Sequence, residues 1–193
     1  MAVNGYGTAS PDTRLELNFY TGRVEVDGKY VTLDDGTPLQ YMPLAVEQNL
    51  TASKYIETAG ARMKKYDVDR TAYSDGRMPD NDIVLYRYAD VLLMKAEAKV
   101  RNGESGDEQL NAVRSRAGMP SLAATLANIL DERLLELVWE GWRRQDMIRF
   151  GTYCAPYDIH TPSAADKKRY TIVFPIPEKA RELNSNLVQN PGY

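Results

Sequence analysis

The sequence is poor in the residues that build disulfides and metal sites. Its 193 residues include one cysteine, Cys154, and one histidine, His160. A single cysteine excludes an internal disulfide framework, and we expect Cys154 to be an unreactive, packed or half-exposed thiol. Carboxylate metal sites on helices usually recruit a histidine in the pattern Glu-x-x-His, and His160 lies outside any such pattern. We therefore expect no metal site.

The chain also lacks an excess of charge and any long apolar run. Its 24 Lys and Arg against 27 Asp and Glu give a formal net charge of −3, so no basic face is available for nucleic acid. No stretch approaches the roughly 18 apolar residues that a membrane span needs. The start, MAVNGYGTASPDTR, has neither the charged beginning nor the apolar segment of a secretion signal. We expect no membrane-spanning segment and no signal peptide in this sequence.

Residues 1–80 are rich in turn signals separated by short alternating runs, which predicts loops and short strands. The clearest hairpin is Gly22–Val31, where Asp27-Gly28 forms a type I′ turn pair. A weak helix is predicted over 47–53, and an extended segment over Gly60–Val68, with Met63 and Tyr66 partly buried. The acidic motifs Asp67-x-Asp69 and Asp80-Asn81-Asp82 do not begin a 12-residue calcium loop.

The pattern changes to helical at Asn81. After a short strand-like segment at Ile83–Arg87, apolar residues at helical spacing predict helices over 88–102 and 106–117, which end at Gly103 and Gly118. Small residues on both predict an antiparallel hairpin of tetratricopeptide size. A third helix is predicted from Leu122 to about Phe150, able to bend at Gly141. Beyond Gly151, prolines 175 and 177 limit Thr171–Ile176 to a short edge strand. The predicted fold class is mainly α.

The third helix concentrates charge beside two tryptophans. It carries Glu132, Glu136 and Glu140 at fourfold spacing, with cationic and acidic neighbours along the same helix, namely Arg133, Arg143, Arg144, Asp146 and Arg149. Such a pattern fits a catalytic carboxylate pair, a metal site or a buried structural network. Arginines close to each glutamate favour ionised, paired carboxylates over a protonated catalytic acid.

The structural interpretation needs cationic partners, because three glutamates on one stripe repel each other by a few tenths of a kcal/mol per pair. Glu140 and Arg144 form a favourable i,i+4 pair, and Arg87, Arg114 or Arg116 must reach across from the preceding segments. We therefore predict a structural network of Arg87, Glu132, Arg133, Glu136, Glu140, Arg144, Asp146 and Arg149. Trp139 and Trp142 are expected to pack between helices.

Four blocks resemble the SusD/RagB family. They are YRYADVLLMKAEA at 86–98, LNAVRSRAGMP at 110–120, DERLLELVWEGWRRQDMIRFG at 131–151, and PIP at 175–177 with NSNLVQNPGY at 184–193. They occur in the family's order across 81–193. SPDTRLELNFY at 10–20 and residues 60–68 resemble the preceding segment more loosely. The resemblance covers the C-terminal part of such proteins, so we expect a fragment of a longer chain in which residues 81–193 form the helical region and 1–80 add loops to the same domain.

The resemblance implies a mostly α-helical, tetratricopeptide-containing lipoprotein on the outer surface of a Gram-negative outer membrane. It would bind a glycan or another nutrient for a SusC-type TonB-dependent transporter, without catalysis or cofactor. Contact with the membrane would come only from a lipid anchor that this sequence does not contain. The charged motif would be scaffold, and most ligand residues would lie upstream.

Among the residues present, Tyr20, Arg23, Tyr30 and Tyr41 fit ligand contact best, because sugar recognition uses aromatic faces and planar polar groups on loops. Two alternatives stay open. One is a glycoside hydrolase that uses the carboxylates of 132–146, and the other is a helical protein-protein adaptor.

Overall fold

The computed structural model describes residues 11–43, 45, 57–66, 68–74, 76, 78–157 and 160–193. The predicted helix over 47–53 and Asp67 lie outside the described residues. The chain divides into two compact units, Met1–Trp142 and Arg143–Tyr193, which are described separately below. Within both units the mainly helical class is confirmed, together with small antiparallel strand pairs.

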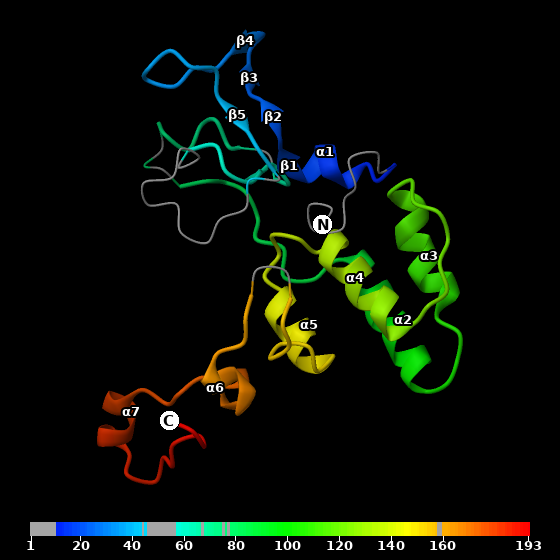
Figure 1. Cartoon of the computed structure of the whole chain (residues 1–193), viewed down its shortest axis with the longest axis vertical. Helices are drawn as coiled ribbons and strands as arrows, with labels where there is room; N and C mark the ends of the chain where they lie inside the picture. The colour runs from blue at the N-terminus through cyan, green and yellow to red at the C-terminus, as the bar shows by residue number, and fades with distance from the viewer. Residues whose placement is uncertain are drawn as a thin grey trace. The chain divides into compact units, whose positions relative to one another are not determined.

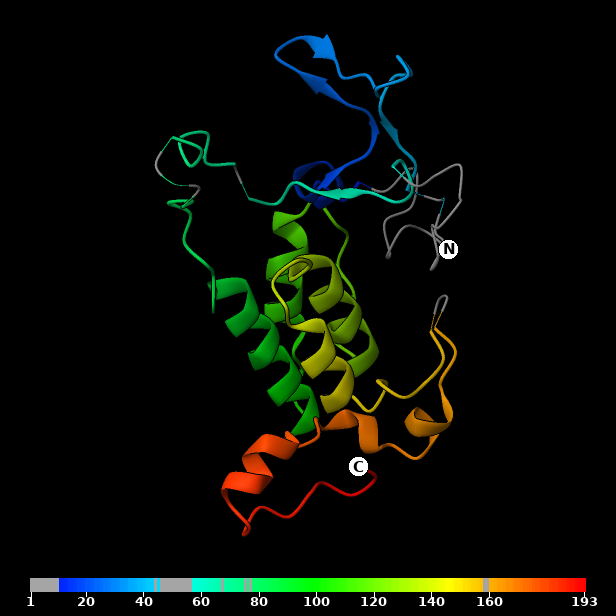
Figure 2. The same ribbon diagram turned by 90° about the vertical axis from the view of Figure 1, so that its left-hand side faces the viewer.

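The predicted helical hairpin is confirmed in the first unit. α2 spans Tyr88–Arg101 and α3 spans Asp107–Arg116, and they lie side by side in Figures 1 and 2. Gly103 follows α2 with a φ of 79°, the left-handed conformation that ends helices. At Gly106 a β-carbon would lie 2.7 Å from the backbone oxygen of Ala96. Only glycine therefore allows the start of α3 to approach α2 this closely.

The third helical region is interrupted. α4 spans Leu126–Glu136, and the side chain of Thr125 caps it by accepting a hydrogen bond from the Asn128 amide at 3.1 Å. α5 spans only Arg143–Arg149 and belongs to the second unit. Between them, Trp139 and Gly141 have φ values of 69° and 80°, which a right-handed helix cannot contain. The single helix predicted over 122–150 is thus corrected to two helices with a break at 137–142.

The core of the first unit lies where α2, α3 and α4 pack together (Figure 2). Leu93, Leu110, Val113 and Ile129 are almost completely buried there, with Ala96 between the helices. Burying each large apolar side chain contributes roughly 1.5 to 3 kcal/mol, so this cluster supplies much of the stability of the hairpin. The same faces carry buried charges, which form the site described below.

Three two-stranded ladders follow the short helix α1, Arg14–Asn18. β1 (Phe19–Tyr20) pairs with β6 (Arg62–Met63), β2 (Gly22–Arg23) with β5 (Gln40–Tyr41), and β3 (Glu25–Val26) with β4 (Lys29–Tyr30). Residues 22–41 form the β-arm of Figure 1, with β3 and β4 at its tip. The predicted turn is confirmed, since both Asp27 and Gly28 have positive φ, at 51° and 75°.

Two other expectations for the first unit are wrong. Residues 83–87 form no strand, and Ile83 and Leu85 point largely into solvent. Met63 is exposed, although its strand partner Phe19 on the same face of the β1–β6 ladder is buried against Leu135. Tyr66 is partly buried, as predicted.

The second unit contains α5, α6 (Ala164–Lys167), the 3-10 turn η1 (Tyr170–Ile172) and α7 (Glu178–Leu183). η1 replaces the edge strand predicted over Thr171–Ile176. The Gln189 side chain instead satisfies Ile176, accepting from its amide at 2.8 Å and donating to its carbonyl at 2.9 Å. Cys154 is partly buried. No helix in the described parts of either unit is long and apolar enough to cross a bilayer.

Candidate functional site

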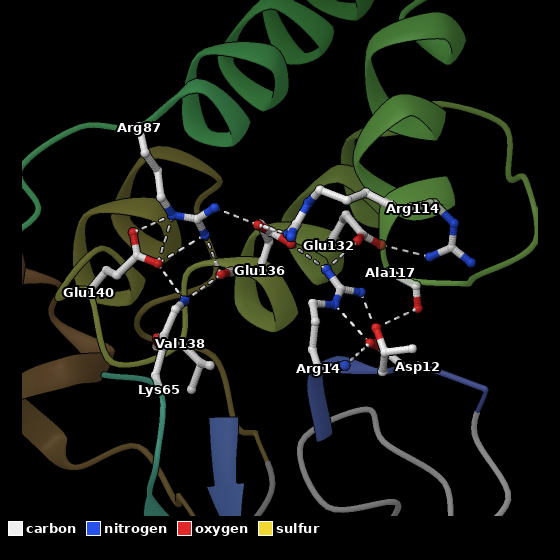
Figure 3. Close-up of polar contacts among 12 residues, drawn as sticks. Asp12, Arg14, Lys65, Arg87, Arg114, Ala117, Glu132, Glu136, Val138 and Glu140 are labelled. Atoms are coloured by element: carbon white, nitrogen blue, oxygen red, sulfur yellow. Dashed lines mark hydrogen bonds and ion pairs between the residues drawn. The ribbon is translucent and has the colours of Figure 1, made fainter. Parts of the chain in front are cut away.

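A buried charge network occupies the inner face of α4 and the break after it (Figure 3). Glu132 is completely buried and accepts bonds from two arginines. Arg14 Nη1 lies 2.7 Å from Glu132 Oε1, and Arg114 Nη1 lies 2.7 Å from Glu132 Oε2. Arg14 comes from α1 and Arg114 from α3, so this carboxylate ties three helices together.

The carboxylate of Glu136 accepts bonds from three arginines. Its Oε1 accepts from Arg87 Nη1 at 2.5 Å and from Arg116 Nη2 at 2.6 Å, and its Oε2 accepts from Arg14 Nη1 at 2.9 Å. Its backbone oxygen accepts from Arg87 Nη2 at 2.5 Å and Lys65 Nζ at 2.7 Å. These donors also satisfy the end of α4, whose last carbonyls have no partner within the helix.

Glu140 lies outside any helix and is held by two cations. Arg87 Nε donates to both of its carboxylate oxygens at 2.9 Å, and Lys65 Nζ forms an ion pair with Oε1. The expected i,i+4 pair with Arg144 therefore gives way to longer-range partners. Arg144 lies in the second unit, where its Nη2 donates to the carbonyls of Thr171 and Ile172 at 3.2 Å each.

The remaining members include residues that the sequence pattern missed. Asp12 receives Arg14 Nε at 2.8 Å and Nη2 at 2.7 Å, and Asp90 receives Arg133 Nη1 at 2.7 Å with both side chains about 1% exposed. The block SPDTR at 10–14 carries Asp12 and Arg14, but nothing in its spacing relates it to residues 132–136. In the second unit, Asp146 and Arg149 form an i,i+3 pair at 2.8 Å.

The electrostatics of the network keep Glu136 ionised. Burial alone would raise the pKa of Glu136, but hydrogen bonds and charges from Arg87, Arg14 and Arg116 outweigh it and hold the pKa below 4.5. Burial likewise opposes the charge on Arg14, yet its bonds to Asp12 and Glu132 raise its pKa above the ordinary value. Burial lowers the pKa of Lys65, against the attraction of Glu140. An ionised carboxylate that accepts three guanidinium bonds is neither a proton donor nor an open nucleophile.

A cavity of about 620 Å³ opens beside the network. Among the described residues, its lining includes Tyr20, Tyr66 and both cations and carboxylates, namely Arg14, Lys64, Lys65, Arg70, Arg87, Arg116, Glu136 and Glu140. We call it the cationic cavity. Its size falls in the range of small-molecule sites, which run from about 300 to 1,000 Å³.

An adjoining groove of about 700 Å³ is mostly apolar. Its lining combines apolar and aromatic side chains with a few polar ones, namely Met63, Tyr66, Val68, Ala72, Pro79, Ile83, Val84 and Trp139 with Asp69, Asn81, Asp82 and Glu140. We call it the aromatic groove. It shares Tyr66, Val68, Val84 and Glu140 with the cationic cavity, so the two spaces are neighbours.

Trp139 is the largest side chain of the aromatic groove. It stands in the break after α4 with a left-handed backbone, is 46% exposed, and has Phe19 on one side with ring centroids 6.0 Å apart. The expectation that Trp139 packs between helices is wrong, because the break turns its ring away from the helical core. Trp142 contacts Tyr86, which precedes α2, and their ring centroids lie 5.3 Å apart.

The four predicted ligand residues do not form one site. Tyr20 lines the cationic cavity, with Lys64 Nζ 5.5 Å from its ring centroid. Arg23 and Tyr30 lie together on the β-arm, with the guanidinium 4.4 Å from the ring centroid. The guanidinium of Arg62 lies over the Tyr41 ring, 4.6 Å from its centroid. Among these four, Tyr20 alone lines either described space.

Comparison with known proteins gives a consistent result. A model of the SusD family matches residues 12–193. The starch-binding protein SusD of Bacteroides thetaiotaomicron is 31% identical over 139 residues, which are 68% of this chain and 25% of that protein. SusD-like protein P25 of Formosa agariphila is 32% identical over 69% of this chain and 28% of its own length.

Solved structures that resemble this chain include surface glycan-binding proteins. Surface glycan-binding protein A from B. thetaiotaomicron is 31% identical, with a TM-score of 0.57 over 68% of this chain and 30% of its own. Its counterpart from Bacteroides uniformis, at 24% identity, shares the fold with a TM-score of 0.64 over 94% of this chain and 38% of its own. This chain spans about a quarter to two fifths of the length of these relatives. The chain belongs to the SusD family.

Proposed function

We propose that the protein containing this chain binds glycans at the outer surface of the outer membrane and passes them to a SusC-type TonB-dependent transporter. The names of the relatives support the ligand class, since they include a starch-binding protein and two surface glycan-binding proteins. Transfer to the transporter, the surface location and the absence of catalysis follow from the family resemblance. The ligand class, the transfer step, the surface location and the absence of catalysis are all proposed for the whole protein, of which this chain is a part.

The aromatic groove is the best candidate for glycan contact in this chain. A sugar ring offers apolar C–H faces and a belt of hydroxyl groups, so it needs a flat aromatic surface beside fixed polar groups. Trp139 supplies the surface, and its half-exposed ring in an apolar groove is the observation on which the proposal rests.

Asp69 supplies a fixed acceptor at the same groove. Its Oδ1 accepts from the Thr71 amide at 2.8 Å and the Thr71 hydroxyl at 2.7 Å, and its Oδ2 accepts from the Asp80 amide at 2.8 Å. These bonds lower the pKa of Asp69, so the carboxylate stays charged at neutral pH and can accept hydrogen bonds from sugar hydroxyl groups. Asn81 and Asp82 add an amide and a second carboxylate.

The charge network then serves as the frame for this groove. Glu140 belongs to both, and it links Arg87 and Lys65 to the loop that carries Trp139. Because Glu132, Glu136 and Glu140 are each held by at least two cations, the alternative of a glycoside hydrolase using these carboxylates is disfavoured. The β-arm residues Arg23, Tyr30 and Tyr41 are proposed as secondary ligand contacts.

A variant that removes the tryptophan ring without straining the backbone tests the proposal. Trp139→Gly suits the left-handed φ of 69°, which costs non-glycine residues about 1 to 2 kcal/mol, so relief of strain offsets the lost contact with Phe19. We expect stability to change by less than about 1 kcal/mol, while retention on immobilised starch and other polysaccharides in affinity electrophoresis is lost.

Tyr88→Ala is the matched control, because Tyr88 is also exposed but lies on α2 outside the groove lining. It should bind like the wild type. Equal retention of Trp139→Gly and the wild type would contradict the groove assignment. Release of reducing sugar by the pure protein would contradict a non-catalytic role.

A further inference from the structure

The cationic side chains that line the cationic cavity outnumber the carboxylates that could compensate their charge. Within the part of the chain that the structure describes, six cationic side chains and two carboxylates line it. Glu136 and Glu140 are already saturated by Arg14, Arg87, Arg116 and Lys65. Lys64 and Arg70 add two further charges to the wall, and no carboxylate among the described lining residues remains to match them.

The cations are also placed to reach a ligand. The Arg116 side chain is 60% exposed and uses one of its five N–H donors on Glu136 at 2.6 Å. Lys64 is fixed at the wall, since its Nζ donates to the Glu16 carbonyl at 2.9 Å and lies 5.5 Å from the Tyr20 ring centroid. Arg70 is exposed. An acidic group entering the cavity would meet three cationic side chains of exposed residues, in front of the buried ion pairs of Glu136 and Glu140.

We propose that this cavity binds the acidic group of a negatively charged sugar, a uronate carboxylate or a sulfate ester, whose ring contacts the neighbouring aromatic groove. The shared residues Tyr66 and Val84 place the two spaces side by side. An arginine fork can donate two parallel hydrogen bonds to a pair of oxygens of a carboxylate or a sulfate, and an exposed lysine adds an unselective charge. The inference rests on the proposed function for the sugar ring, but recognition of the anion rests on the cavity alone.

The test uses small probes that carry the charge with and without the sugar. Glucuronate, glucose and inorganic sulfate are titrated into the chain by calorimetry at low ionic strength. Wild-type protein should bind glucuronate at least about tenfold more tightly than glucose, and added salt should weaken glucuronate binding. Comparison of glucuronate with sulfate shows which of the two anions the cavity prefers.

Two double variants assign the effect to the cavity. Lys64→Gln with Arg70→Gln removes two cations that take no part in the buried ion pairs, and it should weaken glucuronate binding about tenfold while glucose binding stays the same. Lys95→Gln with Lys179→Gln changes the net charge equally at exposed positions outside the cavity and should have no effect.

The outcomes separate this inference from the proposed function. Equal binding of glucuronate and glucose, no binding of glucuronate, or unchanged binding in the Lys64→Gln, Arg70→Gln variant would each overturn the anion site. If glucuronate binds through the cavity while polysaccharide retention is absent or survives Trp139→Gly, the anion site stands and the glycan-binding groove fails. If Arg116→Gln, tested in the same way, also loses glucuronate binding, the fork geometry is supported.

Discussion

Replacing Glu136 by glutamine should be among the most destabilising single changes in the chain. The glutamine keeps the size of the side chain but removes a charge that contacts Arg14, Arg87 and Arg116. It also replaces one acceptor oxygen by an NH₂ group, which faces guanidinium donors. Breaking a buried ion pair by removing one partner costs about 3 to 5 kcal/mol, because the opposite charge is left buried without compensation.

That cost is large compared with the whole stability of a domain, which is about 5 to 15 kcal/mol. We therefore expect Glu136→Gln to lower the midpoint of urea unfolding substantially, with an unchanged slope if the denatured state is not altered. Asp131→Asn is the matched control, because Asp131 lies on the same helix but faces solvent. Its effect should stay within about 0.5 kcal/mol.

The same variant has a pH signature. The folded pKa of Glu136 lies below its ordinary value of 4.5, so the carboxylate contributes stability above that pH and loses it as the pH falls toward the folded pKa. The difference in unfolding free energy between wild type and Glu136→Gln should be full at pH 7 and shrink below about pH 4.5. Urea unfolding at pH 7, 5, 4 and 3.5 measures this difference.

Two results would refute this account of the network. A loss below 1 kcal/mol at pH 7 would place the pairs in the class of exposed salt bridges, which contribute about 0 to 1 kcal/mol. A difference between the two proteins that does not change with pH would show that packing of the side chain, rather than its charge, is responsible.

Two further predictions concern glycines. Gly106→Ala places a β-carbon 2.7 Å from the Ala96 carbonyl oxygen, so α2 and α3 must separate. Urea unfolding should show that the free energy of unfolding falls by about 1 to 3 kcal/mol. An unchanged midpoint would contradict the close approach. In Gly28→Ala the new β-carbon meets no atom within 4 Å, but the residue is strained at a φ of 75°. Amide hydrogen exchange should show that the free energy of opening the β3–β4 hairpin falls by about 1 to 2 kcal/mol, while global unfolding is unchanged. A loss of global stability would show that the tip of the β-arm belongs to the core.

The helical hairpin and the turn of the β-arm could be predicted because their signals are local. α2 and α3 follow from apolar spacing within 14 and 10 residues, and each is followed by a glycine with a left-handed backbone. Asp27-Gly28 specifies its turn through the φ values that these two residues tolerate. The blocks in order across 81–193 also sufficed to recognise the family, and the family model matches residues 12–193.

The break after α4 was not predictable from periodicity. The apolar spacing continues through residues 137 and 138, and Gly141 alone indicates only a bend. The helix ends where Arg87 and Lys65 bind its last carbonyl, at Glu136, and Lys65 also binds the Val138 carbonyl and the Glu140 carboxylate. These bonds give the chain a stable alternative to another turn. Trp139 changes from an expected packing residue to a half-exposed one for this reason.

The sequence by itself determined the family, the α2–α3 hairpin and the presence of paired charges around Glu132, Glu136 and Glu140. Only the tertiary structure decided which cations reach them. Arg14 lies 118 residues before Glu132, and Lys65 lies 75 residues before Glu140. Local periodicity determines which side of a helix is buried, but a charge finds its partner through the packing of distant segments. The cationic cavity and the aromatic groove arise from that packing, and no short stretch of sequence encodes them.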